Sequence, residues 1–103
     1  MAILYRQGDV LLIKHDRLPS SAVLAPHDSD RIVLASGKAT GHEHAVSPEH
    51  AQSFHLDNET FLEVTQGAVL RHDEHAPIQL EPGIYKVVRQ REFDPTSFKY
   101  VND

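Results

Sequence analysis

The stretch Asp9-Val10-Leu11-Leu12-Ile13-Lys14 (DVLLIK) decides the fold. It places four consecutive apolar residues between Gly8 and a polar stretch that begins at Lys14. A short apolar run that is bounded by a glycine and by polar residues is typical of a buried β-strand. We therefore expect the core of the protein to be built from strands.

Similar short segments follow along the chain, and none shows a sustained apolar stripe with the period of a helix. The candidate strands are 3–5, 9–14, 31–36, 38–46, 53–56, 60–64, 68–72, 77–80, 84–93 and, last, 97–101. Between them we expect a loop over 19–30 with at most one helical turn at 20–24, a turn or one helical turn over 47–52, and a hairpin turn at Asp57-Asn58-Glu59. We expect about seven to nine of these segments to form strands, which predicts an all-β protein, either a small β-barrel or a cupin-like sandwich.

Length and composition indicate a single domain that spans residues 1–103. The 103 residues suffice for one core and are too few for two ordinary domains, and 40% of them are hydrophobic. The absence of cysteine excludes thiolate metal sites and thiol nucleophiles, and leaves imidazole and carboxylate groups as metal ligands. The N-terminal residues resemble neither a signal peptide nor a membrane span, so we expect a soluble, cytoplasmic protein with no membrane partner.

The charge pattern argues against binding to nucleic acid. The formal net charge is −5, and the basic residues are scattered apart from Arg89-Gln90-Arg91. A nucleic-acid surface usually carries a clustered basic face. The eight histidines are an unusual number, and their protonation would reverse the sign of the net charge, so a pH-dependent property is an open alternative.

Two of the histidines lie in Thr40-Gly41-His42-Glu43-His44-Ala45 (TGHEHA). Residues i and i+2 of a strand point to one face, about 6.6 to 7 Å apart, so His42 and His44 can direct both rings at one ion. Neither face of this segment carries a large aliphatic residue. The segment therefore suits a site better than it suits a core.

A second pair, His72 and His75, lies in Arg71-His72-Asp73-Glu74-His75-Ala76-Pro77 (RHDEHAP). The spacing of three does not share one face of a strand, but the rings can converge across a tight turn. We predict that both pairs form one metal site. Zinc takes nitrogen or oxygen ligands at about 2.0 to 2.2 Å. The two pairs could supply either three protein ligands, with water as the fourth, or four protein ligands that leave no open position. Zinc is the first expectation, and nickel, iron and manganese are alternatives.

The simpler alternative is that these histidines are solvated or bonded to nearby carboxylates. Glu43 should point away from a site that its two neighbours face, yet Glu43 and Glu74 are the candidates for a catalytic acid or base beside the ion. Glu49 and Asp73 could be a ligand and a partner of an imidazole, respectively. The remaining histidines are expected to be ordinary surface or core-edge residues: His15, His27, His50 and His55.

The motif His42-Glu43-His44, with Glu49 after it, resembles the first metal motif of the cupins. In that family two histidines and a glutamate, joined by a later histidine, hold a divalent metal in a β-barrel. The resemblance implies a similar ion here. The chain departs from the pattern at the later ligand position, where it carries Tyr85.

The chain also resembles a family of small, uncharacterised bacterial and phage-associated proteins. The resemblance implies that the histidine blocks and the last long strand belong to one small β domain. The blocks that carry it are Arg6-Gln7-Gly8-Asp9-Val10-Leu11-Leu12, Thr40-Gly41-His42-Glu43-His44, His72-Asp73-Glu74-His75-Ala76-Pro77-Ile78, Pro82-Gly83-Ile84-Tyr85 and Arg89-Gln90-Arg91-Glu92-Phe93.

The long strand over 84–93 supplies candidates for substrate binding. Arg89 or Arg91 could project toward an anionic substrate, since guanidinium pairs well with phosphate or carboxylate, or could pair with Asp9. Tyr85 completes this candidate set. The simpler account is a strand whose end reaches solvent.

Three classes of function follow from these patterns. The first is a metal-dependent enzyme, with hydrolase or cupin-like chemistry, and the second is a module with a structural metal. The third is an adaptor that binds a protein partner without metal. The sequence contains no nucleophile elbow, phosphate loop or dinucleotide fingerprint. A homo-oligomer is an open expectation, because small β domains often pair an exposed edge.

Overall fold

The computed structural model describes residues 4–36 and 41–89, and within these ranges the protein is all-β, with ten strands and no helix. No helix in these ranges is therefore long and apolar enough to span a membrane. The strands are β1 (Leu4–Gln7), β2 (Val10–His15), β3 (Val23–Leu24), β4 (Ile32–Ser36), β5 (Glu43–Val46), β6 (Ala51–Leu56), β7 (Glu59–Val64), β8 (Ala68–Leu70), β9 (Ile78–Leu80) and β10 (Gly83–Arg89).

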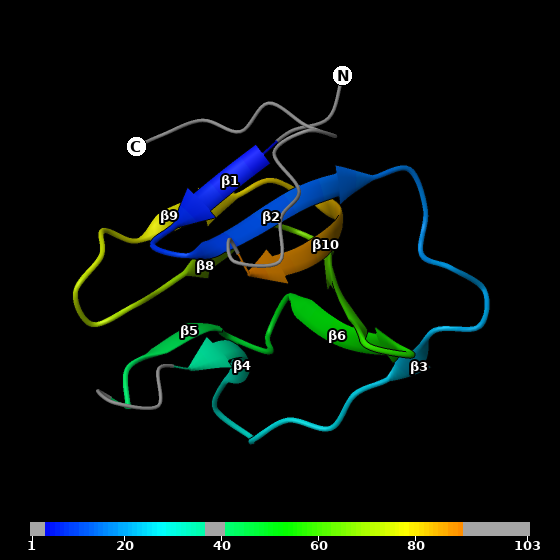
Figure 1. Ribbon diagram of the computed structural model, residues 1–103, viewed down its shortest axis with the longest axis horizontal. Coiled ribbons are helices and arrows are strands. Elements are labelled where there is room, and N and C mark those ends of the chain that lie inside the picture. Colours follow the sequence, from blue (N-terminus) through cyan, green and yellow to red (C-terminus); the bar gives the residue numbers. More distant parts are fainter. Residues whose placement is uncertain (1–3, 37–40, 90–103) are drawn as a thin grey trace.

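Six strands form an antiparallel sheet in the order β1-β2-β10-β7-β6-β3 (Figure 1). β2 lies inside the sheet, where it pairs with β1 on one side and with β10 on the other. The apolar run that opens β2 suits this buried position. Val10, Leu11 and Leu12 are fully buried there. The Asp57-Asn58 turn joins β6 to β7 as a hairpin, with Asp57 at a φ of 54°. The hairpin predicted from the sequence is thus confirmed.

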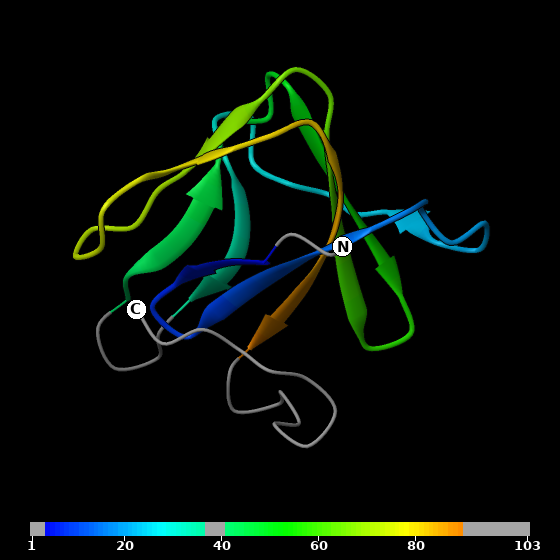
Figure 2. The ribbon, with the colours of Figure 1, turned by 90° about the horizontal axis from the view of Figure 1, so that it is seen from above.

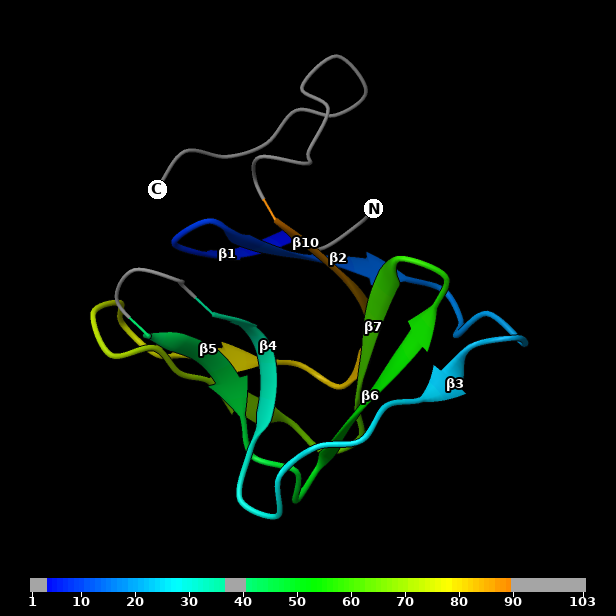
Figure 3. The same cartoon turned by 60° about the horizontal axis from the view of Figure 1, so that its bottom comes forward.

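The other four strands form two hairpin-like pairs, β4–β5 and β8–β9. A bridge between Ala45 and Arg71 joins the pairs through two backbone hydrogen bonds of 3.0 and 2.8 Å. Figure 3 shows these strands across from the six-stranded sheet. The sheets are not hydrogen-bonded into one closed barrel within the described ranges.

One shared core holds the sheets together. Its buried side chains come from both groups of strands, which explains why neither group forms a separate unit. The fully buried large side chains include Phe61, Leu62, Leu70 and Tyr85. The short apolar runs of the sequence therefore predicted a compact all-β domain correctly.

Some predicted boundaries differ from the structure. The loop predicted over 19–30 contains the two-residue strand β3. The helical turn considered for 20–24 is not present there. The turn predicted over 47–52 ends earlier, because β6 already begins at Ala51. The strand predicted over 38–46 begins at Glu43, and residues 37–40 lie outside the described ranges, as do 90–93 and the predicted strand 97–101.

Replacing Leu62 by alanine should lower the free energy of unfolding by about 2 to 5 kcal/mol, because the deletion leaves a cavity in a fully buried position. Urea denaturation at equilibrium measures the change. The matched control is Leu24→Ala, since Leu24 is 55% exposed, and it should change the free energy by less than about 0.5 kcal/mol. Equal losses in the two variants would contradict this placement of the core.

Candidate functional site

Three connecting segments meet at one end of the molecule. They are the turn between β1 and β2, the start of β5, and the loop between β8 and β9, and the three views agree on their proximity (Figures 1, 2 and 3). The first segment carries Gly8 and Asp9. The second and third carry the two predicted histidine pairs.

The structure brings all four of these histidines together. Ring centroids lie 4.2 Å apart for His44 and His72, and 4.7 Å apart for His72 and His75. The distances are 5.6 Å for His42 and His72 and 6.1 Å for His44 and His75. The convergence that the sequence spacing predicted is therefore present in the fold.

His44 is the buried member of the cluster, at 5% exposure. Its Nδ1 lies 2.9 Å from Oε1 of Gln7. The amide nitrogen of Gln7 donates to the carbonyl oxygens of Leu70 and Ala76, both at 3.0 Å, so Oε1 must be the atom that faces His44. We therefore assign the proton to Nδ1 of His44, which leaves a lone pair on Nε2.

The pKa of His44 favours the same neutral state. Burial lowers it to about 4, with a further contribution from neighbouring His72, while the carboxylate of Asp9 opposes the shift. The imidazole is thus uncharged at neutral pH. A neutral imidazole with a fixed tautomer is the form that binds a metal ion.

Asp9 presents a carboxylate to this lone pair. Its Oδ1 lies 3.6 Å from Nε2 of His44, and its Oδ2 accepts hydrogen bonds from Nε and Nη2 of Arg89 at 3.0 and 2.9 Å. Partial burial alone would raise the pKa of Asp9, but the hydrogen bond and charge of Arg89 outweigh it and hold the pKa below its usual value. Two acceptor atoms therefore face each other, an arrangement that a cation between them would stabilise.

Gly8 allows the β1–β2 turn to approach the rings. Its φ is 61°, which L-residues with a side chain rarely adopt. A Cβ atom at this position would lie 2.7 Å from Nε2 of His75 and 3.3 Å from Cε1 of His44. The glycine is therefore required both by the turn and by the space over it.

The less buried histidines His42 and His72 are hydrogen-bonded to Glu74. Its carboxylate Oε1 lies 3.1 Å from Nδ1 of His42, and its backbone N–H donates to Nδ1 of His72 at 3.0 Å. Nε2 of His42 also lies 3.7 Å from Oδ2 of Asp73. Glu74 thus lies beside two of the clustered histidines.

The ligand atoms do not yet surround a common point. Within residues 4–36 and 41–89, no group of three or more histidine, aspartate or glutamate side chains already has the arrangement needed to hold a metal ion. The hydrogen bonds to Glu74 occupy Nδ1 of His42 and Nδ1 of His72. Binding of an ion would require at least one ring to rotate.

The other predicted site residues lie elsewhere. Glu43 accepts from Nε of Arg31 at 2.8 Å, on the outer side of β5, and does not join the cluster. Glu49 lies beside His50, with 3.2 Å between Oε1 and Nε2. The structure does not bring these two carboxylates to the histidines.

The candidates on β10 divide in the same way. Tyr85 is fully buried in the core, where its hydroxyl donates to the carbonyl oxygen of Glu81 at 2.6 Å. Arg89 takes the predicted pairing with Asp9. Arg91 lies outside the described residues.

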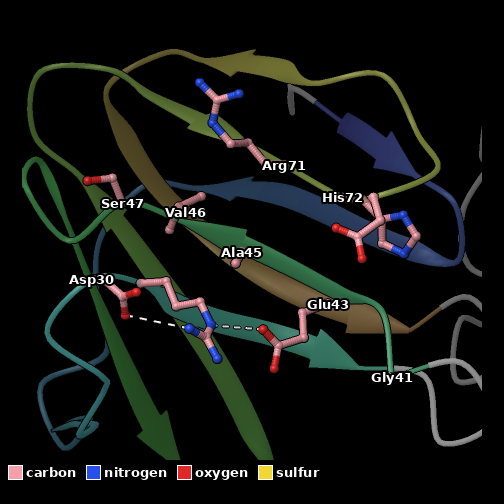
Figure 4. Close-up of a pocket in the computed structure, with 10 residues that line it drawn as sticks. Asp30, Gly41, Glu43, Ala45, Val46, Ser47, Arg71 and His72 are labelled. Carbon is pink, nitrogen blue, oxygen red and sulfur yellow. Dashed lines mark hydrogen bonds and ion pairs between the residues drawn. The ribbon is translucent and has the colours of Figure 1, made fainter.

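A surface pocket of about 480 Å³ adjoins the cluster on the other face of β5. Ala45 and Arg71 are cross-strand partners and share that face, whereas His44 points to the opposite face. Glu43, which pairs with Arg31, lies on one side of the pocket and Arg71 on the other (Figure 4). His72 lines the pocket and also contacts His44, so it connects the pocket to the cluster.

Two residues of the site were not predicted from the sequence: Gln7 as the hydrogen-bond partner of His44, and Asp9 as the carboxylate that faces it. Both flank Gly8 in the block Arg6-Gln7-Gly8-Asp9, and that glycine between polar residues was the available signal. Their roles depend on contacts with residues more than 30 positions away.

Comparison with protein families places the chain in a family. A family described as a domain of unknown function, DUF8820, matches residues 6–90, and the protein belongs to it. The match covers the three segments that form the cluster and agrees with the uncharacterised family expected from the sequence. Comparisons with curated proteins and with solved structures found no match.

Substituting alanine for Gly8 should displace the ring of His75 and lower the free energy of unfolding by about 1 to 2 kcal/mol, because of the positive φ. Histidine side-chain NMR spectra and urea denaturation measure the two effects. Gly67→Ala is the control, because Gly67 has a φ of 105° but a Cβ there would make only ordinary contacts. Histidine spectra that shift equally in both variants would contradict the close approach at Gly8.

Without metal, the stability of the protein should fall as pH is lowered from about 6.5 to about 4. The unfolded chain protonates His44 at its ordinary pKa, whereas the folded protein does so only near 4, so protons favour unfolding in this window. The loss from this residue is at most roughly 3 kcal/mol. Urea denaturation in EDTA should show a shallower decrease for His44→Gln than for the control His55→Gln, and equal slopes would contradict the prediction.

Proposed function

We propose that the protein binds one divalent metal ion at the histidine cluster, with zinc as the first candidate and nickel, iron and manganese as alternatives. The observation that carries the proposal is the convergence of four imidazoles, from two separate segments, beside an ionised carboxylate. Imidazole and carboxylate are suitable ligands for these metals. Gln7 serves as the partner that orients a ligand histidine, a common feature of metal sites.

Packing alone accounts poorly for the cluster. Four imidazoles that lie this close together give up part of their hydration, and positive charges on several of them would repel one another. Within the described residues every buried side-chain polar atom has a partner, so His44 is satisfied through Gln7. Its Nε2, however, faces an acceptor oxygen of Asp9, and an ion would turn this contact into an attraction.

Such an ion would supply Lewis-acid or hydroxide chemistry, and Glu74 is the nearby carboxylate that could act as a base. The protein would then be a metal-dependent hydrolase or an enzyme with cupin-like chemistry. In the same proposal the strands approximate a barrel with the ion at its mouth, and the protein works in the bacterial cytoplasm.

A protein-interaction module, with a structural metal or none, is the second candidate. One observation favours it. Val23, Leu24 and Val33 are exposed at 67%, 55% and 39%, and they lie on β3 and β4, each at the edge of its sheet. Exposed apolar residues at unpaired edges are suited to a protein partner, including a second copy of this chain.

Tag-free protein dialysed against zinc should retain about one equivalent per chain, and His44→Gln should lose it, because the buried, neutral imidazole is removed. Elemental analysis measures the metal. The control is His55→Gln, since His55 is exposed and lies outside the cluster. If the wild-type protein retains no zinc, nickel, iron or manganese and none of them raises its Tm, the metal proposal is wrong and the interaction module is favoured.

A further inference from the structure

We infer that the protein ligands of the ion are His44, His75 and Asp9, and that His42 and His72 lie beside the ion without binding it. The inference rests on the proposed metal binding and identifies the ligands of that site. It replaces a set of four histidines by a set of two histidines and one carboxylate. The hydrogen bonds of the rings, and the carboxylates that the rings face, separate the ligands from the other two histidines.

The pair His44 and Asp9 already has the spacing of two ligands on one ion. Two ligands at zinc distances and a tetrahedral angle lie about 3.4 Å apart. Nε2 of His44 and Oδ1 of Asp9 are 3.6 Å apart. Gln7 fixes the lone pair of His44 on Nε2, and Arg89 binds the other oxygen of Asp9 and leaves Oδ1 directed at the histidine.

His75 is the second histidine of the set because its ring is uncommitted. Within the described ranges neither of its ring nitrogens has a hydrogen-bond partner, and its side chain is exposed. Its Nε2 lies over Gly8, where it is near both the ring of His44 and the residue next to Asp9. Rotation of this one ring therefore completes the set without loss of a hydrogen bond.

His72 has the opposite state. Its Nδ1 accepts the backbone N–H of Glu74, so its Nε2 carries the proton in the neutral ring. Binding through either nitrogen would cost that hydrogen bond or that proton. His42 is held by the carboxylate of Glu74 at 3.1 Å and lies near Asp73. His72 is therefore better suited to line the site than to bind the ion. His42 keeps a lone pair on Nε2, but this atom faces Oδ2 of Asp73 at 3.7 Å and not Asp9, so His42 lies outside the proposed set.

This ligand set leaves a position on the ion for a further ligand. Three protein ligands are typical of zinc sites that bind water or substrate, whereas four are typical of structural sites. The carboxylate of Asp9 also reduces the combined charge of the divalent ion and its ligands from +2 to +1. This remaining positive charge still favours binding of an anion. The geometry points to a small anionic ligand, bound on the exposed side of the cluster where His42, His72 and Glu74 lie.

Zinc affinity, measured by competition with a chromophoric chelator, tests the ligand set. Asp9→Asn and His75→Gln should each weaken zinc binding by at least about 100-fold, whereas His72→Gln should weaken it much less. Two controls separate ligand loss from misfolding. Asp73→Asn makes the same change on the exposed carboxylate near His42, and Arg89→Gln removes the ion pair with Asp9 but keeps the carboxylate. Both should bind zinc more tightly than Asp9→Asn does.

Cobalt in place of zinc tests the open position. Addition of azide should change the visible spectrum of the cobalt-loaded protein, because azide enters the free coordination site. A spectrum that azide leaves unchanged would overturn the open position. Zinc binding that depends on His72 as strongly as on His75, with Asp9→Asn unaffected, would overturn the ligand set while leaving the proposed metal binding intact. Failure of the wild-type protein to bind zinc or cobalt would overturn both.

Discussion

The site depends on the hydrogen bonds of one buried side chain, that of Gln7. A buried carboxamide must use its donors and its acceptor, because each one left without a partner costs free energy. Gln7 is only 2% exposed and satisfies this constraint by spanning three parts of the fold. It ties β1 to the end of β8 and to the loop before β9, and its oxygen remains for His44. The tautomer of one histidine thus follows from the way in which two sheets are joined.

A second line of contacts meets the first at His44. Arg89 at the end of β10 holds Asp9 in the β1–β2 turn, and Asp9 faces the nitrogen that Gln7 leaves without a proton. The guanidinium keeps the carboxylate ionised, while burial keeps the imidazole neutral. The two groups are therefore in the protonation states that a metal ion requires, and the cause in each case is the surrounding protein. The pocket on the outer face of β5 is governed separately, by the pairing of Arg31 with Glu43.

The sequence was sufficient for features that depend on local pattern. Short apolar runs predicted most strands, and the spacing within each histidine pair predicted that both rings of a pair could serve one site. It was insufficient where a contact joins distant segments. Two-residue β3 has no alternation of its own and exists because it pairs with β6. Gln7 and Asp9 were missed because only sheet pairing brings them to His44, and the burial of Tyr85 follows from the position of β10 between β2 and β7.

The wide sequence separation of the cluster has a consequence for the order in which the protein acquires its parts. Residues 7–9, 42–44 and 72–75 meet only when the six-stranded sheet and both two-stranded sheets have formed, and Arg89 lies 80 positions from its partner Asp9. Such non-local contacts form late and make folding slow, because the chain loses the entropy of loop closure before the contacts contribute favourable free energy. During synthesis the N-terminal half would emerge with two histidines of the cluster, His42 and His44, before the other two have been made. Any ligand that recognises the assembled cluster would therefore select the finished fold over partly folded chains, and would stabilise it by mass action.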